Sequence, residues 1–257
     1  MEIDTTKPNA GRIYDYYLGG SHNFEVDRQA AEQLLKLMPS TKPGARLNRW
    51  FLYDAVERLA QQGFDAYLDL ASGLPTQGYI HEIVPQAHVL YTDHDPVTVA
   101  YGQQIIGDKP NVRYIQANIM YPETILQAAE THFGGQRRIA ICFVGSTYFV
   151  DKPTLRSIME QLFAWCAPGS QMALSLLAGD VQAFTRSQYA AIYARMNATI
   201  YPLELPEVAE ILGPWRIAEP GLLTLGEWHQ LGEWRGEPGE EDADQPLDFY
   251  GVLVTKE

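Results

Sequence analysis

The sequence predicts an α/β fold with a mostly parallel seven-stranded sheet, helices on both faces and a helical N-terminal cap. Three observations support this prediction. Short apolar runs alternate with helical patterns from Phe64 onward. The first 62 residues contain no convincing strand, and two further apolar runs follow residue 214. Strand–helix alternation is typical of a parallel sheet that is covered by helices on both faces.

Five apolar runs are predicted to be the parallel strands of this sheet. They lie near residues 65–70, 87–92, 112–117, 138–144 and 170–177. The helices between them are expected near residues 76–84, 96–106, 122–132 and 153–166. The last two strands are expected at residues 215–225 and 249–255.

We expect a single domain over residues 1–257. It comprises a helical cap over 1–62 and an α/β core over 63–257, and the core carries a helical insertion at 178–213. Apolar residues recur at helical spacing within residues 48–62, and Gly63 ends that helix. The remaining helices are expected at residues 25–38, 184–198 and 207–212. Residues 233–245 hold six acids and are expected to form a solvated loop.

The composition argues against several classes of partner. The formal net charge is −13, so the chain is short of the Lys and Arg that neutralise phosphates. We therefore expect it to bind neither nucleic acid nor an anionic membrane surface. No apolar run approaches the roughly 20 residues that a membrane helix needs. Cys142 and Cys166 resemble small buried apolar residues, and with a polar start at residues 1–12 we expect a reducing cytoplasm.

A small-residue loop follows the first predicted strand, in FDAYLDLASGLPT. A dinucleotide fold needs GxGxxG there, but the three positions are Ala71, Gly73 and Thr76, so a pyrophosphate cradle is poorly made. S-adenosylmethionine (SAM) carries a sulfonium and no phosphate, and needs only a close backbone approach and hydroxyl acceptors. The loop from Asp69 through Ala71, Ser72 and Gly73 meets this weaker requirement.

An acid closes the second predicted strand, in VLYTDHDP. A carboxylate there accepts hydrogen bonds from both hydroxyls of a ribose. Asp95 precedes Pro96 and suits a helix cap, which leaves Asp93 for the ribose, with His94 beside it.

The ends of the third and fourth strands complete the predicted cofactor site. Asn118 and Ile119 follow the third strand, and the amide of Asn118 either meets an adenine edge or forms a turn. Gly145 follows the fourth strand, at the edge of the sheet where ligands bind in open α/β folds.

These features resemble the class I SAM-dependent methyltransferases, which have a Rossmann-like fold. More closely, the chain resembles a bacterial family called simply S-adenosyl methyltransferase, formerly a domain of unknown function. The resemblance rests on NAGRIYDYYLGGSHNFEVDRQAAE (9–32), ARLNRWFLYDAV (45–56), LDLASGLPTQGYIHE (68–82), YTDHDP (91–96) and AEPGLL (218–223). It implies SAM as the cofactor and leaves the acceptor unidentified. Two departures are Ala71, where glycine is usual, and Asn118, where aspartate is common.

The N-terminal segment is rich in aromatic and charged residues, and we expect it to lie over the cofactor. Tyr14, Tyr17, Asn23 and Arg49 are the predicted cap and acceptor residues. Arg49 is expected to pair with the cofactor carboxylate, or with one of two acids in the segment, Asp15 and Asp27.

Methyl transfer is an in-line displacement in which the enzyme mainly aligns the two reactants. A general base is needed only for an oxygen or nitrogen acceptor that must lose a proton. The candidates for that base are His22, Asp15, Tyr148 and Asp180. The six histidines do not show a metal-ligand spacing, so we expect no metal.

Three functions are consistent with these features. The first is a SAM-dependent methyltransferase that acts on a small molecule. The second is a SAM-binding protein without catalysis, such as a sensor or a partner-regulated module. The third is a nucleotide oxidoreductase built on a similar sheet.

Overall fold

The structure is a computed structural model, and it describes residues 6–74, 78–231 and 246–257. Seven strands form the main path of one sheet in the order β3-β2-β1-β4-β5-β8-β6, and the short β7 pairs with β8 beside them. The first five strands in the chain are parallel, whereas β8 is antiparallel to β5, β6 and β7. The strands are β1 (Ala66–Asp69), β2 (His88–Asp93), β3 (Val112–Gln116), β4 (Ala140–Phe143), β5 (Gln171–Gly179), β6 (Arg216–Ile217), β7 (Leu223–Thr224) and β8 (Leu247–Thr255).

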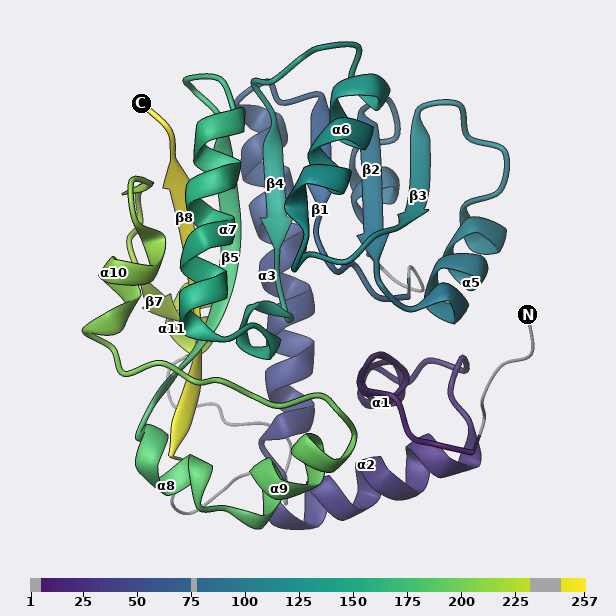
Figure 1. Cartoon of the computed structure of the whole chain (residues 1–257), viewed down its shortest axis with the longest axis vertical. Coiled ribbons are helices and arrows are strands. Elements are labelled where there is room, and N and C mark those ends of the chain that lie inside the picture. The colour runs from purple at the N-terminus through teal and green to yellow at the C-terminus, as the bar shows by residue number, and fades with distance from the viewer. Residues whose placement is uncertain (1–5, 75–77, 232–245) are drawn as a thin grey trace.

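Helices cover both faces of this sheet, as predicted (Figure 1). One face packs against α6 (Pro122–His132), α7 (Lys152–Trp165) and α10 (Glu207–Leu212). The other face packs against α3 (Thr41–Gln61), α4 (Ile80–Ile83) and α5 (Pro96–Ile106). A short α11 (Leu225–Trp228) packs on α3 and β8. The strand order changes direction between β1 and β4, which is where ligands bind in folds of this kind.

Most predicted elements match the structure to within two residues, but four predictions were wrong in their bounds, among them the helix expected at 76–84. The expected strand at residues 215–225 is interrupted, because Pro220 has no N–H to donate and Gly221 turns the chain at a φ of 105°. The expected helix at 184–198 is divided into α8 (Val181–Thr185) and α9 (Gln188–Arg195), because Ser187 caps α9 by accepting from the N–H of Ala190. Helix α3 begins at Thr41, seven residues before its predicted start, because Pro43 is tolerated in a first helical turn.

Two predictions concern segments that lie partly or wholly outside the described residues. The helix expected at 76–84 is the short α4, which begins four residues late, because the described Gly78 and Tyr79 are not helical and Tyr79 is extended at the N-cap; residues 75–77 are not described. The acidic loop expected at 233–245 falls within residues 232–245, which also lie outside the described part of the chain.

The cap consists of α1 (Ala10–Tyr17) and α2 (Glu25–Leu37), followed by the first turns of α3. Figure 1 shows α1 and α2 beyond the carboxyl ends of the parallel strands, next to α9. Ile13 and Tyr17 are buried on one side of α1, where they pack with residues of α2 and α9. The cap is therefore joined to the core through an apolar cluster and through the continuous helix α3.

A buried carboxylate fixes the geometry of this cap. Asp27 is fully buried, and its Oδ2 accepts from Arg12 Nε at 2.7 Å and from Phe24 N at 2.9 Å. Its Oδ1 accepts from Asn9 N at 2.9 Å. Asp27 on α2 thus binds both the start of α1 and the first turn of its own helix.

We predict that Asp27→Ala destabilises the cap strongly. Loss of one partner leaves Arg12 as a buried uncompensated charge, which costs about 3–5 kcal/mol. Urea unfolding and protease cleavage within residues 10–37 would measure the effect. Glu25→Ala is the control, because the ion pair of Glu25 with Arg28 is exposed and its loss should leave stability near that of the wild type. Equal effects of the two substitutions would contradict a special role for Asp27.

Candidate functional site

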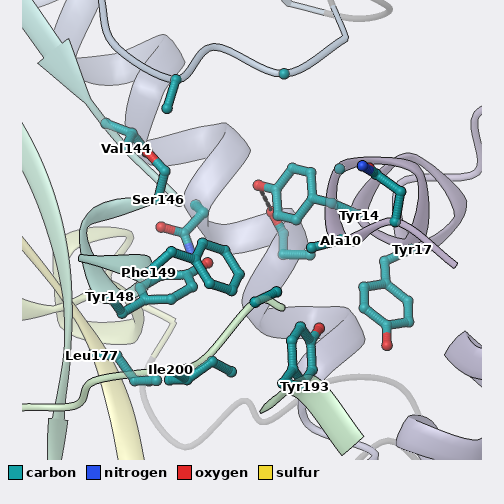
Figure 2. Close-up of a pocket in the computed structure, with 18 of the residues that line it drawn as sticks. Ala10, Tyr14, Tyr17, Val144, Ser146, Tyr148, Phe149, Leu177, Tyr193 and Ile200 are labelled. Atoms are coloured by element: carbon teal, nitrogen blue, oxygen red, sulfur yellow. Dashed lines mark hydrogen bonds between the residues drawn. The ribbon is translucent and has the colours of Figure 1, made fainter. Parts of the chain in front are cut away.

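A cavity of about 480 Å³ lies at the carboxyl ends of β1, β2 and β4 and is also lined by residues of α1 and α3. All nine residues predicted for the cofactor line it: Asp69, Ala71, Ser72, Gly73, Asp93, His94, Asn118, Ile119 and Gly145. Its other part is lined by aromatic rings, several of which Figure 2 labels. We call these two parts the strand-tip half and the aromatic half.

The loop after β1 is bound to the end of β2. Ser72 N donates to Thr92 O at 2.8 Å, and Thr92 N donates back to Ser72 Oγ at 3.1 Å. Gly73 N donates to Asp93 Oδ2 at 3.1 Å. Ala71 has a φ of 50°, the left-handed conformation that favours glycine. Alanine there keeps the glycine-like path of the loop at a cost of roughly 1–2 kcal/mol.

Asp69 and Arg49 form the charged centre of the strand-tip half. Asp69 is 4% exposed, and its Oδ2 has no hydrogen-bond partner among the described residues. Burial raises the pKa of Asp69 to about 7, although the nearby charge of Arg49 acts in the opposite direction. The guanidinium of Arg49 lies 4.6 Å from the centre of the Tyr79 ring and donates to the Tyr79 hydroxyl at 3.3 Å. Its Nε has no partner in the described part of the chain.

Asp93 is anchored by the backbone and keeps unused acceptor capacity. Besides Gly73 N, it accepts from Asp95 N at 2.9 Å, and His94 Nδ1 lies 3.4 Å from its Oδ1. The neighbouring Asp93 raises the pKa of His94. Asp95 caps α5 by accepting from Thr98 N and Thr98 Oγ1, as predicted. Since each carboxylate oxygen accepts about two hydrogen bonds, the two backbone donors leave Asp93 two positions, one of which faces the His94 ring.

Asn118 takes part in a turn, which was one of its two predicted roles. Its Oδ1 accepts from Met120 N at 2.9 Å. The amide nitrogen has no such bond to the turn, and the residue lines the cavity together with Ile119.

The N-terminal candidates divide between the cavity and the interior of the cap. Tyr14, Asp15, Tyr17 and Arg49 line the cavity. The Tyr14 hydroxyl donates to Ala45 O at 3.0 Å, drawn as the dashed line in Figure 2.

Two further candidates, Asn23 and His22, are not among the residues that line the cavity. Asn23 Nδ2 and His22 N both donate to Asp15 Oδ2 at 2.9 Å, so this loop folds back on α1. The His22 ring packs 5.2 Å from the ring of Tyr101. Gly20 is required here, since a Cβ would lie 2.1 Å from Asp15 Oδ1.

Two other predicted bases are poorly suited to accept a proton from an acceptor. Asp180 has a structural role, and the Tyr148 hydroxyl stays protonated. Asp180 caps α8 by accepting from Ala183 N at 2.9 Å, and it is not among the residues that line the cavity. Tyr148 lines the cavity, but burial raises its pKa well above the ordinary value.

Sequence reasoning missed most of the aromatic half. Phe184, Tyr189 and Tyr193 of the insertion and Phe249 of β8 all line the cavity, although their spacing indicated only core packing. Asn48 was also missed: it is fully buried on α3, lines the cavity, and its Oδ1 lacks a partner among the described residues. A buried amide on an otherwise apolar helix face is the signal that would have found it.

The family of the chain follows from a model match over nearly its whole length. Residues 1–256 match the model of the family described as S-adenosyl methyltransferase. The chain belongs to this family. SAM is the methyl donor that the family implies, and the predicted resemblance is confirmed.

Two solved structures are similar over the full chain. A candidate methyltransferase from Thermobifida fusca YX is 28% identical, with a TM-score of 0.84 over 99% of this chain and 97% of that one. A DUF574 family protein from Streptomyces avermitilis MA-4680 is 26% identical, with a TM-score of 0.82 over 100% of both chains. A SAM-dependent methyltransferase from Anabaena variabilis, at 12% identity and a TM-score of 0.57, shares the Rossmann-like fold alone.

A partial similarity to curated proteins extends over 141 residues. This stretch is 28% identical to 5'-nucleotidase SurE from Vibrio vulnificus strain CMCP6, and it covers 52% of this chain and 46% of that protein. The chain thus spans about half the length of the curated relatives it matches, and this similarity assigns no family. Among the described residues, no helix is long and apolar enough to cross a membrane, and no cluster of three or more His, Cys, Asp or Glu is placed to hold a metal ion.

We predict that Asp69 makes the stability of the ligand-free protein fall as pH rises. Its folded-state pKa of about 7 lies above the ordinary value of 3.8. The folded protein therefore holds a proton that the unfolded chain releases above about pH 4. The stability that this proton contributes, on the order of 4 kcal/mol in total, is lost between about pH 4 and pH 7. Above about pH 7, Asp69 causes no further change of stability with pH.

Urea unfolding at pH 4 and pH 8 would test this prediction. Asp69→Asn should gain stability relative to the wild type between these two values, because the amide does not ionise. Asp65→Asn is the control, since Asp65 lies one residue before the same strand and is exposed. Parallel pH profiles for Asp69→Asn and the wild type would show that Asp69 is already ionised at pH 4.

Proposed function

We propose that this protein transfers the methyl group of SAM to a small-molecule acceptor. The observation that carries the proposal is the joining of a polar strand-tip half and an aromatic half within one cavity. A volume of about 480 Å³ lies within the range of small-molecule sites, which is roughly 300–1,000 Å³.

The residues of the strand-tip half fit SAM. Asp69 Oδ2 and Arg49 Nε are buried and without partners among the described residues, and the two groups are oppositely charged once Asp69 is ionised. Their charges match the ammonium and the carboxylate of the cofactor's methionine moiety. We assign the ribose hydroxyls to Asp93 and the adenine to Asn118 and Ile119, with His94 at the rim. When bound, SAM supplies a methyl group made electrophilic by the sulfonium.

The backbone shapes the place where the methyl group would lie. Gly145 follows β4 at a φ of 77°, and a Cβ there would be 3.7 Å from the Tyr14 hydroxyl. The chain thus brings a bare backbone from the core and a ring from the cap to the same point. We propose that the backbone at Gly145 closely approaches the methyl group of SAM, and that the ring of Tyr14 separates the two halves of the cavity.

The cap then covers the reactants. Tyr14 and Tyr17 on α1 face the cavity in Figure 2, opposite Tyr148 and Phe149. This arrangement excludes water and fixes the direction from which an acceptor approaches. Positioning of this kind supplies up to about 7–11 kcal/mol of barrier reduction without any chemical group from the protein.

We predict that Asp93→Ala weakens SAM binding by about 1.5–3 kcal/mol, or roughly 10- to 150-fold in Kd, because hydrogen bonds to a charged group are lost. Calorimetric titration would measure the change, with NAD titrated in parallel. Asp151→Ala is the control: Asp151 caps α7 and is not among the residues that line the cavity, so SAM affinity should not change. Unchanged affinity in folded Asp93→Ala, or tighter binding of NAD than of SAM, would contradict the proposal.

Turnover distinguishes an enzyme from a SAM-binding sensor. Methyl-labelled SAM incubated with the protein and a metabolite panel should yield a labelled small molecule. Tight SAM binding with no labelled product on any compound of a broad panel would favour the sensor.

A further inference from the structure

The aromatic half of the cavity contains a continuous series of six rings. Their centres are separated by 5.7 Å from Phe249 to Tyr148, 4.9 Å to Phe149, 6.1 Å to Tyr193, 5.1 Å to Tyr189 and 6.0 Å to Phe184. All six residues line the cavity. We call this series the aromatic wall.

The wall is assembled from segments that are distant in the sequence. Tyr148 and Phe149 follow β4, Tyr189 and Tyr193 belong to α9, and Phe249 belongs to β8. Tyr14 and Tyr17 of α1 close the opposite side, with Tyr193 beneath them in Figure 2. Rings on two sides of one space select a flat apolar molecule that stacks between them.

The charged groups that line the cavity as a whole are mostly acidic, and Asp69 and Asp93 among them belong to its strand-tip half. Among the described residues, Asp15, Asp69, Asp93 and Asp95 line the cavity, against Arg49 and His94. The faces of tyrosine and phenylalanine rings also carry negative potential. The cavity therefore disfavours an anion and favours a species that becomes positively charged.

The groups that face the aromatic half are poor bases. Burial raises the pKa values of Tyr14, Tyr148 and Tyr193 above the ordinary value, so these phenols stay protonated at neutral pH. The carboxylate of Asp15 is engaged by His22 N and Asn23 Nδ2. No described Lys, His or Glu lines the cavity apart from His94, which is paired with Asp93 in the other half.

We propose that the acceptor is an uncharged aromatic molecule that is methylated on a nitrogen, either a ring nitrogen or an aryl amine. This inference rests on the proposed function and names the substrate class of the same site. Hydroxyl and thiol acceptors react as anions, which need a base and a cavity that tolerates negative charge. A neutral nitrogen needs neither, because its lone pair is already available.

The reaction balances without a group from the protein. The nitrogen lone pair forms the new bond to the methyl carbon while the carbon–sulfur bond breaks and leaves its electron pair on sulfur. The positive charge passes from sulfur to nitrogen, and the sulfur product is a neutral thioether. A ring nitrogen keeps the charge, whereas an aryl amine afterwards releases a proton to water. The aromatic wall faces the charge in its final position.

Four two-ring compounds of similar size would test this proposal: isoquinoline, 1-aminonaphthalene, 1-naphthol and 1-naphthoate. Binding is measured by calorimetry on the full chain saturated with S-adenosylhomocysteine, and transfer by mass spectrometry with SAM. The two nitrogen compounds should bind at least about tenfold tighter than 1-naphthoate, since like charges repel. Only these two should be methylated, and isoquinoline should give N-methylisoquinolinium.

A pair of variants tests the role of the wall separately. Tyr193→Leu should weaken N-methylisoquinolinium binding about fivefold or more, whereas Tyr193→Phe should keep it, because the ring face and not the hydroxyl attracts the cation. The Kd of SAM should be the same in both variants.

Several outcomes would overturn the inference. These are preferential binding of 1-naphthoate, methylation of 1-naphthol on oxygen, failure of all four compounds to bind, or equal cation affinity in the two Tyr193 variants. If SAM binds normally in these cases, only the substrate class is wrong. If SAM itself does not bind, the proposed function is wrong as well.

Discussion

The hydrogen bonds between the loop after β1 and the end of β2 position the rest of the site. Ser72 and Thr92 exchange two bonds, and Gly73 N donates to Asp93. These contacts join two neighbouring strand ends into one rigid edge. Because Asp69 precedes the loop and Asp93 receives it, the spacing of the two carboxylates is set by the backbone. The core backbone alone therefore forms the strand-tip half of the cavity, and the cap covers it.

The cap is held in place by other interactions than the hydrogen bonds that join the strand ends. A buried ion pair and an apolar cluster hold α1 against α2, while α3 runs from the cap into the core as one helix. Tyr14 lies where the cap meets the core. Its hydroxyl donates to Ala45 O of α3 and lies next to Gly145 of the core. A shift of α1 would therefore alter both halves of the cavity together.

The parts that sequence predicted well are those set by local patterns. Helices α5, α6 and α10 have the predicted bounds, since Pro starts the first two and Gly213 follows the third. Strand-tip residues were also found, because strand ends in a parallel sheet converge on one edge. All nine of them line the cavity, although their roles toward SAM stay predictions.

The aromatic half could not be predicted, for a physical reason. Residues of α9 and β8 reach the cavity only through long-range packing, and apolar side chains show the same periodicity whether they face a core or a ligand. His22 and Asn23 differ in the opposite sense, since neither is among the residues that line the cavity. Their polar character suggested a site, but they satisfy Asp15 within the cap.

Asp69 and Arg49 have polar atoms without partners among the described residues, and these atoms both lower the stability of the ligand-free protein and are suited to bind the cofactor. Burying Asp69 and Arg49 near each other costs desolvation that their mutual attraction only partly offsets. The raised pKa of Asp69 is the sign of that cost. A ligand that carries both an ammonium and a carboxylate removes it by supplying a counter-charge to each group. The same reasoning applies to the other half, where aromatic faces gain most when a positive charge arrives. Under the proposed substrate class, the cavity is best matched to a zwitterion at the strand tips and a cation against the rings, which is the state just after transfer to nitrogen.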